Sequence, residues 1–264
     1  MARSINALIL GDLVGQAGCR ALFLALPNLV KKYSADIVVV NGENAAAGFG
    51  LTPDILDKLL SSGVHVVSSG NHIWQRKEIF PYLDSQPRLL RPCNYPKGVP
   101  GHGWFIAEAR GTKAAVINLE GRVYMSNLLC PFATAKDVIR RIKQEARIIL
   151  IDFHAEDPEE KEALGLYLDG EASAVFGTHT HVATADERIL PGGTAYITDI
   201  GMIGPADSVI GFPADISVQR VLTQMPLKAE AADSPACICG ICVEVDAENG
   251  KALKIERVRH QSMV

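Results

Sequence analysis

The sequence predicts an α/β fold in which helices lie outside a pair of mixed β-sheets. In the first half of the chain, short apolar runs alternate with helical patterns, as strands joined by helical crossovers do. The second half adds two predicted hairpins, around Pro191-Gly192-Gly193 and Glu248-Asn249-Gly250. With 264 residues, 48% of them hydrophobic, the chain can bury a large core, and we expect a single domain over residues 1–264.

Short apolar runs predict the strands of the first half, at residues 5–10, 36–40 and 64–68. The first run has no alternation of polar and apolar side chains, which is typical of a strand covered on both faces. Residues 13–18 are expected to form a glycine-containing loop. Gly15 and Gly18 within it match neither of the common nucleotide-binding glycine patterns, so we expect a turn that serves the site.

Helices are predicted between these strands, at residues 19–33, 52–62 and 76–83. The second helix has the clearest boundaries. Thr52 suits its cap, Pro53 suits its first turn, and Gly63 suits the position after its end. Pro27 lies inside the first helix and predicts a kink there.

Strands of the second half are predicted at residues 104–109, 114–119, 148–153 and 173–176. A helix at residues 134–146 precedes the third of these strands. Asp157-Pro158-Glu159-Glu160 marks the start of another helix, with a capping side chain, a proline and two acids in the positive first turn. Hairpins beside parallel strands indicate mixed sheets rather than purely parallel ones.

Composition and charge exclude several classes of protein. The formal net charge is −4 and there is no basic tract, so we expect no binding to long nucleic acid. No apolar run reaches the roughly 18 residues of a membrane span. Residues 1–12 lead directly into a strand and lack the parts of a signal peptide, which predicts a cytoplasmic protein. A homo-oligomer is compatible with these features.

Six cysteines occur, at positions 19, 93, 130, 237, 239 and 242. The first three are scattered and are expected to be unpaired in a reducing compartment. The group Cys237-x-Cys239-x-x-Cys242 resembles a metal motif, but it lies in an apolar run typical of a buried strand. Because structural zinc sites need a fourth ligand at a suitable spacing, we interpret these three cysteines as small buried hydrophobic residues.

Five of the predicted strands end in polar residues. These ends are Gly11-Asp12, Asn41-Gly42-Glu43-Asn44, Gly70-Asn71-His72, Asp152-Phe153-His154 and Gly177-Thr178-His179-Thr180-His181. In open α/β sheets, ligands gather beyond the carboxyl ends of the strands, so we expect the five ends to meet at one edge. In extended backbone, side chains two residues apart point the same way, which would let His179 and His181 reach one point.

These strand ends supply a mixed set of oxygen and imidazole ligands: Asp12, Glu43, Asn44, Asn71, His154, His179 and His181. The set is too large for one tetrahedral zinc and suits two Fe, Mn or Zn ions with octahedral coordination. Two such ions about 4 Å apart bind a phosphoryl group and lower the pKa of a bridging water. Glu43 can bridge the pair, and His72, just past a strand end, is placed to act as a general acid.

Each of these residues also has a structural interpretation. A single Asp or Asn at a strand end is usually a turn former, and His154 alone could be a satisfied core histidine. His65 lies inside a predicted strand and is interpreted as structural. His102 and His260 have no companions and are given no role. The functional interpretation therefore depends on five strand ends coinciding.

The motifs at these ends resemble those of the calcineurin-like metallophosphoesterases and, more narrowly, of the bacterial YmdB-like family from end to end. The stretches that match the narrower family are Asn41-Gly42-Glu43-Asn44-Ala45-Ala46, Gly70-Asn71-His72-x-Trp74, Ile151-Asp152-Phe153-His154-Ala155-Glu156, Gly177-Thr178-His179-Thr180-His181-Val182 and Thr198-Asp199-Ile200-Gly201-Met202. The wider superfamily has Asp-x-His at the first strand end and a bridging Asp at the second. This chain has Val14 and Glu43 there, as the narrower family does.

The resemblance implies a four-layer αββα sandwich of two mixed sheets with outer helices, the metallophosphoesterase fold. It implies two transition-metal ions, iron first, with manganese or zinc as alternatives. One ion would be held by Asp12, Glu43, Asn44 and His181. The other would be held by Glu43, Asn71, His154 and His179, with His72 as the proton donor.

The implied reaction is hydrolysis of cyclic nucleotides, notably 2′,3′-cyclic mononucleotides, by attack of a hydroxide that bridges the metal ions. Three alternatives stay open: a phosphomonoesterase, a nuclease acting on short RNA or DNA, and a non-catalytic regulatory protein that keeps the fold and metals. All the proposed ligands are present together with His72, which favours catalysis.

Overall fold

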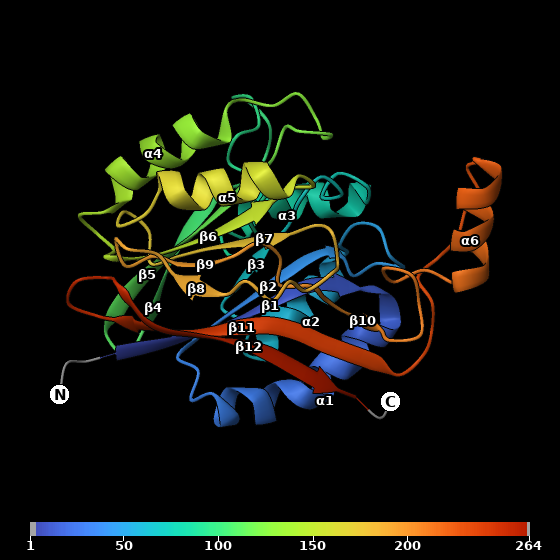
Figure 1. Ribbon diagram of the computed structural model, residues 1–264, viewed down its shortest axis with the longest axis horizontal. Coiled ribbons are helices and arrows are strands. Elements are labelled where there is room, and N and C mark those ends of the chain that lie inside the picture. The colour runs from blue at the N-terminus through green and yellow to red at the C-terminus, as the bar shows by residue number, and fades with distance from the viewer. Residues whose placement is uncertain (1–3, 263–264) are drawn as a thin grey trace.

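Two β-sheets packed face to face, with helices on their outer sides, make up the structure (Figure 1). It is a computed structural model that describes residues 4–262. The expected absence of a signal peptide concerns residues 1–12, of which the first three lie outside the described residues. Both sheets are mixed, and each has six strands within the described part of the chain.

The first sheet is built around β1 (Ser4–Val14), which lies parallel to β2 (Ile37–Asn44). Its order is β12-β11-β10-β1-β2-β3, with β3 (Val66–Ser68), β10 (Met202–Pro205), β11 (Ala236–Asp246) and β12 (Ala252–Gln261). β3 and β10 extend the parallel part, whereas β11 runs antiparallel to β1 and forms the predicted hairpin with β12. Every residue of β2 is buried, so this strand is covered on both faces.

The second sheet is built around β6 (Ile148–His154). Its order is β4-β5-β6-β7-β9-β8, with β4 (Trp104–Ala109), β5 (Thr112–Glu120), β7 (Ala174–Thr178), β8 (Arg188–Ile189) and β9 (Ala195–Ile197). β5, β6, β7 and β9 are parallel, while β4 and β8 are antiparallel strands at the two edges. The hairpin predicted around residues 191–193 is therefore confirmed, and the strands predicted at residues 104–109 and 114–119 form another antiparallel pair.

Helices cover the outer face of each sheet. They are α1 (Gly15–Lys32), α2 (Pro53–Ser61), α3 (Phe80–Ser85), α4 (Pro131–Ile142) and α5 (Pro158–Tyr167). A single 3₁₀ turn, η1 (Lys77–Ile79), directly precedes α3. In Figure 1, α1 lies on one side of the sheet pair and α4 and α5 lie on the other.

Three apolar clusters separate these four layers and confirm the predicted sandwich. The first joins α1, α2 and α3 to the first sheet, through side chains such as Leu22 and Leu56. The second fills the space between the sheets, where Ile9 of β1 and Phe176 of β7 are both buried. The third joins α4 and α5 to the second sheet, with Ile139 among its members.

The predicted starts of α2 and α5 are confirmed in position, but the two helices differ in their caps. Asp157 caps α5, since its side chain accepts a hydrogen bond of 2.8 Å from the backbone N–H of Glu160. Thr52 occupies the cap position of α2 in extended backbone, but its side chain makes no capping hydrogen bond. Pro53 follows at the first helical position, where its missing N–H costs nothing.

The loop predicted at residues 13–18 is wrong. β1 continues to Val14 and α1 begins directly at Gly15. Gly15 turns the chain with a φ of +62°, a left-handed conformation that glycine adopts without strain. Gly18 lets α1 lie against β10, because a Cβ at this position would be 2.2 Å from the carbonyl oxygen of Ile203. Both glycines therefore serve a direct connection between strand and helix.

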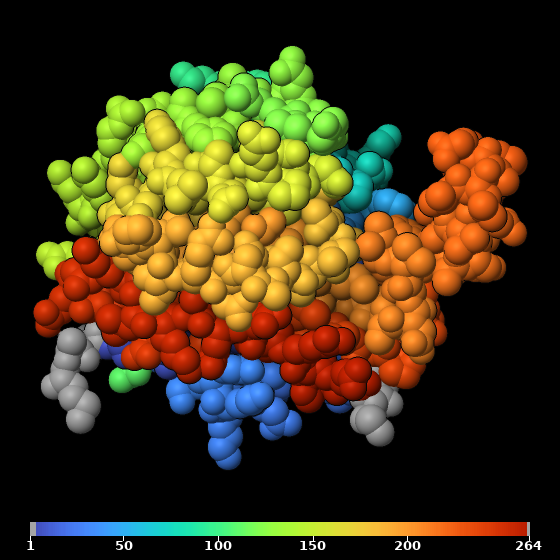
Figure 2. Space-filling model, viewed as in Figure 1, coloured from blue at the N-terminus to red at the C-terminus, as the bar shows by residue number. Residues whose placement is uncertain are grey.

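β10 and the helix α6 (Ala214–Thr223) have no counterpart among the predicted elements. β10 is short, and its prolyl residue weakens a strand pattern. α6 has no buried residue and stands away from the rest of the molecule (Figures 1 and 2). Among residues 4–262, no helix combines the length and the apolar character that a membrane crossing requires.

Candidate metal centre

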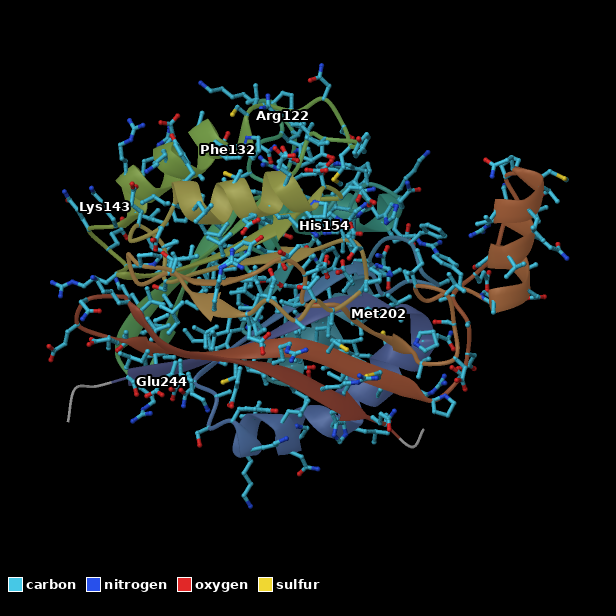
Figure 3. The ribbon with its side chains drawn as sticks, in the orientation of Figure 1. Arg122, Phe132, Lys143, His154, Met202 and Glu244 are labelled. Carbon is cyan, nitrogen blue, oxygen red and sulfur yellow. The ribbon has the colours of Figure 1, made fainter. Side chains whose placement is uncertain are left out.

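The polar strand ends meet at one edge of the sandwich, where the two sheets face each other. Within the first sheet, Asp12 of β1 pairs with Asn41 of β2, so the carboxyl ends of these strands lie side by side. Within the second sheet, His154 of β6 pairs with Thr178 of β7. Side chains from both sheets then come into contact, and Figure 3 shows His154 in the interior of the molecule.

Glu43 lies at the centre of this cluster. Its Oε1 is 3.1 Å from the Nε2 of His154 and accepts a hydrogen bond of 3.1 Å from the Nδ2 of Asn44. Its Oε2 accepts a hydrogen bond of 3.1 Å from the backbone N–H of His72. The side chain is fully buried. Glu43 therefore contacts two separate groups of polar side chains at once.

The first group surrounds His154. The Nε2 of this ring is 3.0 Å from the Oδ1 of Asn71 and 3.0 Å from the Nδ1 of His179. One ligand atom each of Glu43, His154 and His179 lies within 4.8 Å of the other two, an arrangement that could hold a metal ion. These are residues that the family resemblance assigns to one ion, and the structure brings them together.

The second group surrounds Asn44. Its Nδ2 is 3.0 Å from the Nε2 of His181, and its Oδ1 is 2.8 Å from the Nδ1 of His72. The Nδ1 of His181 lies 2.8 Å from the backbone carbonyl of Ile210. Because a carbonyl only accepts, that nitrogen carries the proton, and the lone pair of the His181 Nε2 accepts from the Asn44 amide where no metal ion is bound.

Asp12 contacts the first group, through His179 and His154. Its Oδ2 accepts a hydrogen bond of 3.1 Å from the backbone N–H of His179. Its Oδ1 is 3.7 Å from the Nδ1 of His154 and has no hydrogen-bond partner, although the side chain is fully buried. A buried carboxylate oxygen without a partner is costly, and a cation would satisfy it. This orphaned oxygen and the imidazole donors beside it fit a metal site.

The prediction that His179 and His181 lie in extended backbone and reach one point is wrong. β7 ends at Thr178, and the two histidines follow with φ values of +96° and +64°. Non-glycine residues rarely adopt this conformation, and it is concentrated at functional sites. As a result the two imidazoles contact different partners, His179 in the group around His154 and His181 in the group around Asn44.

Gly70 makes room for the cluster. A Cβ at this position would lie 2.3 Å from the Nε2 of His154 and 2.5 Å from the Oε2 of Glu43. The chain passes so close to both side chains that only glycine fits. Gly70 precedes Asn71, so this close approach also places the Asn71 side chain beside His154.

A hydrogen-bond network behind His154 escaped the sequence reasoning. The Nδ1 of His154 donates to the hydroxyl of Thr178 at 2.9 Å, and that hydroxyl donates to the Oδ1 of Asp152 at 2.7 Å. The chain of bonds places one proton on Nδ1, so Nε2 is the nitrogen at which a metal ion would bind. The available signal was the spacing, since Asp152 is two residues before His154 and shares its face of β6.

A second network supports the loop that carries His179 and His181. Lys161 of α5 and Asp199 form a buried ion pair of 2.7 Å. Asp199 also accepts a hydrogen bond of 2.8 Å from the hydroxyl of Thr180, which lies between the two histidines. In the sequence, Asp199 stands out only as part of a family resemblance, because its role depends on a contact with a distant helix.

Burial and mutual contact shift the pKa values in the cluster. Burial raises the pKa of Asp12 to about 6, against the effect of His181 and His154. Burial also acts to raise the pKa of Glu43, but His154 and His72 hold it well below its usual range. For His154, the neighbouring Glu43 outweighs burial and raises the pKa to about 9. A metal ion binding here would therefore displace a proton from His154.

A pocket of about 220 Å³ opens beside the cluster and is lined by Glu43, Asn44, His72, His179 and His181. Apolar residues complete its wall. The side chain of His72 is 22% exposed, so its ring can meet a molecule that enters the pocket.

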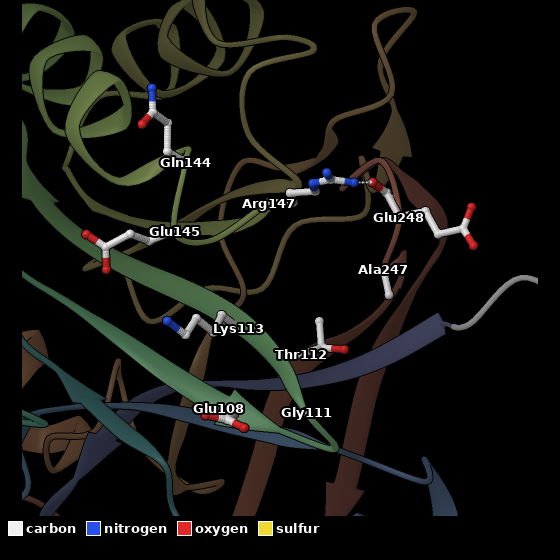
Figure 4. Close-up of a pocket in the computed structure, with 9 residues that line it drawn as sticks. All are labelled: Glu108, Gly111, Thr112, Lys113, Gln144, Glu145, Arg147, Ala247 and Glu248. Atoms are coloured by element: carbon white, nitrogen blue, oxygen red, sulfur yellow. Dashed lines mark hydrogen bonds between the residues drawn. The ribbon is translucent and has the colours of Figure 1, made fainter.

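Another hollow, of about 530 Å³, lies at the opposite end of the second sheet, between residues such as Lys113, Glu145 and Glu248 (Figure 4). Figure 4 shows the Arg147 side chain reaching across to the backbone carbonyl of Glu248, at 2.5 Å. This hollow adjoins the amino ends of β5 and β6, whereas ligands of open α/β sheets bind at the carboxyl ends. None of its lining residues is a histidine or a cysteine.

Two structural predictions outside the site have different outcomes. His65 accepts a hydrogen bond of 3.1 Å from the backbone N–H of Val38, which agrees with a structural role. The prediction that all three late cysteines are buried is wrong. Cys242 is buried, but Cys237 and Cys239 are half-buried, with their sulfur atoms 3.7 Å apart. The alternation of faces along β11 separates the pair from Cys242.

The fold and the cluster define a hydrolase of the metallophosphoesterase class. The chain belongs to the YmdB-like protein family, whose model matches residues 8–258. Over 254 residues it is 45% identical to a protein of Bacillus subtilis (strain 168) named 2′,3′-cyclic-nucleotide 2′-phosphodiesterase, and the match covers 96% of each chain. The metallophosphoesterase class implies divalent metal ions, and the cluster described above could hold them.

Solved structures agree with this assignment. A crystal structure of a novel phosphatase from Mycoplasma pneumoniae matches with a TM-score of 0.93 and 35% identity, over 99% of this chain and 95% of that one. A hypothetical protein from Thermus thermophilus matches with a TM-score of 0.90 and 38% identity, over 98% of this chain and 100% of that one. The NAD nucleotidase of Haemophilus influenzae shares the fold alone, at 14% identity and a TM-score of 0.61 over 99% of this chain and 57% of that one.

Proposed function

We propose that this chain is a metal-dependent phosphodiesterase that hydrolyses cyclic nucleotides, with 2′,3′-cyclic mononucleotides as its substrate class. The observation that carries the proposal is the position of Glu43, between two groups of ligand-type side chains that border one pocket. The name of the Bacillus subtilis relative, at 45% identity, supports the substrate class.

The two groups would hold two transition-metal ions, with iron first and manganese or zinc as alternatives. Asp12, Asn44 and His181 would serve one ion and Asn71, His154 and His179 the other, while Glu43 would serve both. Such ions supply positive charge for the phosphoryl group and an acidified water as nucleophile. The mixed oxygen and imidazole donors suit metals of this kind. Asp12 also lies 3.7 Å from His154, so this carboxylate is close to the group proposed to hold the other ion.

His72 is the proposed general acid. Its Nδ1 lies 2.8 Å from the Oδ1 of Asn44, which fixes the ring and leaves Nε2 as the nitrogen available to a substrate. The ring borders the pocket, so it can deliver a proton to the ribose oxygen that leaves the phosphorus. The Nδ1 of His72 lies 2.8 Å from the Oδ1 of Asn44 and 3.3 Å from the Oε1 of Glu43, so this nitrogen is directed at two proposed ligands rather than at a metal ion.

A substrate panel tests the proposal. The protein is freed of metal, reloaded separately with Fe, Mn or Zn, and assayed on four classes of substrate. These are 2′,3′-cyclic mononucleotides, nucleoside monophosphates, short single-stranded RNA and bis(4-nitrophenyl) phosphate. We expect the highest kcat/KM on the 2′,3′-cyclic mononucleotides and no turnover without metal. Faster turnover of monophosphates or of RNA would replace the proposal by a phosphomonoesterase or a nuclease, and no turnover in any condition would favour a regulatory protein.

A further inference from the structure

The pocket beside the metal centre has an apolar wall that phosphate chemistry does not require. Phe49, Ile210 and Phe212 line it together with the ligand-type side chains. Metal ions and phosphate oxygens are bound by nitrogen and oxygen atoms, so three apolar side chains in the same pocket need another explanation. The two phenylalanines and Ile210 will be called the aromatic wall.

The aromatic wall is continuous with the proposed general acid. The ring of Phe49 meets the ring of His72 edge to face, with centroids 5.2 Å apart and an interplanar angle of 83°. Phe49 in turn contacts Phe212, with centroids 5.4 Å apart and the rings tilted by 32°. A molecule whose phosphate lies at His72 therefore has an aromatic surface within reach of its remaining part.

The aromatic wall is also held in place by the same elements as the metal centre. The backbone carbonyl of Ile210 lies 2.8 Å from the Nδ1 of His181, and Ile210 itself has a strained φ of +48°. On the other side, the side chain of Arg76 donates to the backbone carbonyl of Phe49 at 3.0 Å. The guanidinium of Arg220 lies 5.4 Å from the ring centroid of Phe212. A preformed wall binds a flat ligand with little loss of side-chain freedom.

We propose that the aromatic wall is the subsite for the nucleobase of the substrate. This inference rests on the proposed function. The pocket of about 220 Å³ is smaller than the roughly 300–1,000 Å³ of pockets that enclose a drug-sized ligand. A mononucleotide would therefore place its phosphate in the pocket and lean its base on the wall. Since Phe49 and Phe212 are already in contact, the base packs against them rather than between them.

This subsite would bind a nucleobase without distinguishing one base from another. The wall offers no polar side chain of its own, and Glu156 and Thr180, the polar residues of the pocket outside the proposed catalytic set, each have a partner. Glu156 is 3.1 Å from the Nε2 of His179, and the hydroxyl of Thr180 donates to Asp199. Every nucleobase has an aromatic face, so stacking is tolerant of sequence. We therefore expect the four 2′,3′-cyclic mononucleotides to have kcat/KM values within about tenfold of one another.

The test compares substrates with and without a base on the metal-loaded protein. The base-free substrate is the 2′,3′-cyclic phosphate of methyl ribofuranoside, and 2′,3′-cyclic AMP carries the base. For Phe212→Ala, we expect KM for 2′,3′-cyclic AMP to rise roughly 10- to 100-fold, the usual loss on removing one stacking ring. The KM for the base-free substrate should change far less, so the preference for the base-bearing substrate should shrink.

Matched variants keep the outcome interpretable. Phe212→Leu removes the ring while keeping an apolar side chain, and it should behave like Phe212→Ala if stacking is the cause. Phe212→Tyr keeps the ring and should restore KM. Leu222→Ala, at an exposed position on α6, is the control and should change neither KM.

Two results would overturn the subsite. One is an equal change for both substrates in Phe212→Ala and Phe212→Leu, which would mean that Phe212 only shapes the metal centre. The other is no change for either substrate, which would place the base elsewhere. Failure of the proposed function looks different, because the unmodified metal-loaded protein would then hydrolyse neither substrate.

Discussion

Glu43 is the residue on which both groups of the metal centre depend. Its Oε1 is 3.1 Å from His154 on one side and 3.1 Å from the side-chain nitrogen of Asn44 on the other. No other ligand-type residue within 4–262 has hydrogen-bond-length contacts to both His154 and Asn44. Removing this one carboxylate should therefore affect two metal ions rather than one.

Metal content tests the role of Glu43. The protein saturated with Fe or Mn should contain close to two ions per chain, and Glu43→Ala should lose most of both. Elemental analysis after removal of free metal measures this directly. Glu145→Ala, in the hollow at the opposite end of the second sheet, is the control and should keep both ions. One ion or none in the saturated unmodified protein would rule out the two-metal site.

The role of His72 can be separated from that of a ligand. His72→Ala should keep both metals, but kcat on a cyclic nucleotide should fall by roughly 10²–10⁴, the usual contribution of a positioned acid. The fall should be smaller on bis(4-nitrophenyl) phosphate, because nitrophenolate leaves without protonation. Asn71→Ala should instead lower both the metal content and kcat on every substrate, since Asn71 lies 3.0 Å from His154 among the proposed metal ligands. An equal loss on both substrates after His72→Ala would indicate that His72 binds phosphate.

At the scale of helices and strands, the sequence predicted the elements that carry a pattern of buried apolar residues or a clear helix cap. The fully buried β2 appears as an unbroken apolar run, and α5 is marked by its Asp157 cap. α6 has no buried residue, so no pattern in the sequence tied it to the core. The left-handed backbone at His179 was also beyond prediction, because residue type did not signal it.

The candidate site shows the same division. Its ligand-type residues could be found because each follows an apolar strand, and parallel strands end at a common edge. The residues that support these ligands could not be found from the sequence, because their roles depend on contacts between distant parts of the chain. Asp199 is an example, since Lys161, 38 positions earlier, is its buried partner.

The Lys161–Asp199 pair connects α5 to the loop of His179 and His181, and breaking it should destabilise the whole chain. Asp199→Ala leaves a buried ammonium without a partner, which costs about 3–5 kcal/mol of unfolding free energy. Denaturant unfolding with excess chelator measures this without a contribution from metal. Glu256→Ala breaks an exposed pair of the same 2.7 Å length, with Lys254, and should have little effect. Similar small effects of both variants would show that the buried pair does not stabilise the fold.

β11 carries the cysteines, and these should be dispensable for metal binding. Cys237 and Cys239 lie on one face of the strand and Cys242 on the other, so the three sulfur atoms do not converge. A variant with all three cysteines changed to serine should keep its full metal content, measured by elemental analysis. Loss of one ion with retention of the circular dichroism spectrum would mean that the cysteines form a metal site.

For the molecule as a whole, the metal centre joins the two sheets. Asp12, Glu43 and Asn44 come from β1 and β2 of the first sheet, whereas His154 ends β6 of the second and His179 follows β7. The apolar cluster between the sheets fills the space behind this edge. Among residues 4–262, the buried carboxylates of Asp12 and Glu43 have ion-pair contacts with histidines alone. Metal ions would bind only the folded arrangement, since the ligands are scattered along the unfolded chain.

Thermal stability should therefore depend on metal. A ligand at 100 times its Kd stabilises the folded state by about 2.7 kcal/mol. For a chain of this size, that corresponds to a rise in Tm of about 5–10 °C, which calorimetry with and without excess chelator would measure. Glu43→Gln keeps the shape of the side chain but removes its charge. In this variant, the difference in Tm with and without chelator should largely disappear. If chelator lowered Tm equally in Glu43→Gln and in the unmodified protein, the stabilising metal would have to bind outside this centre.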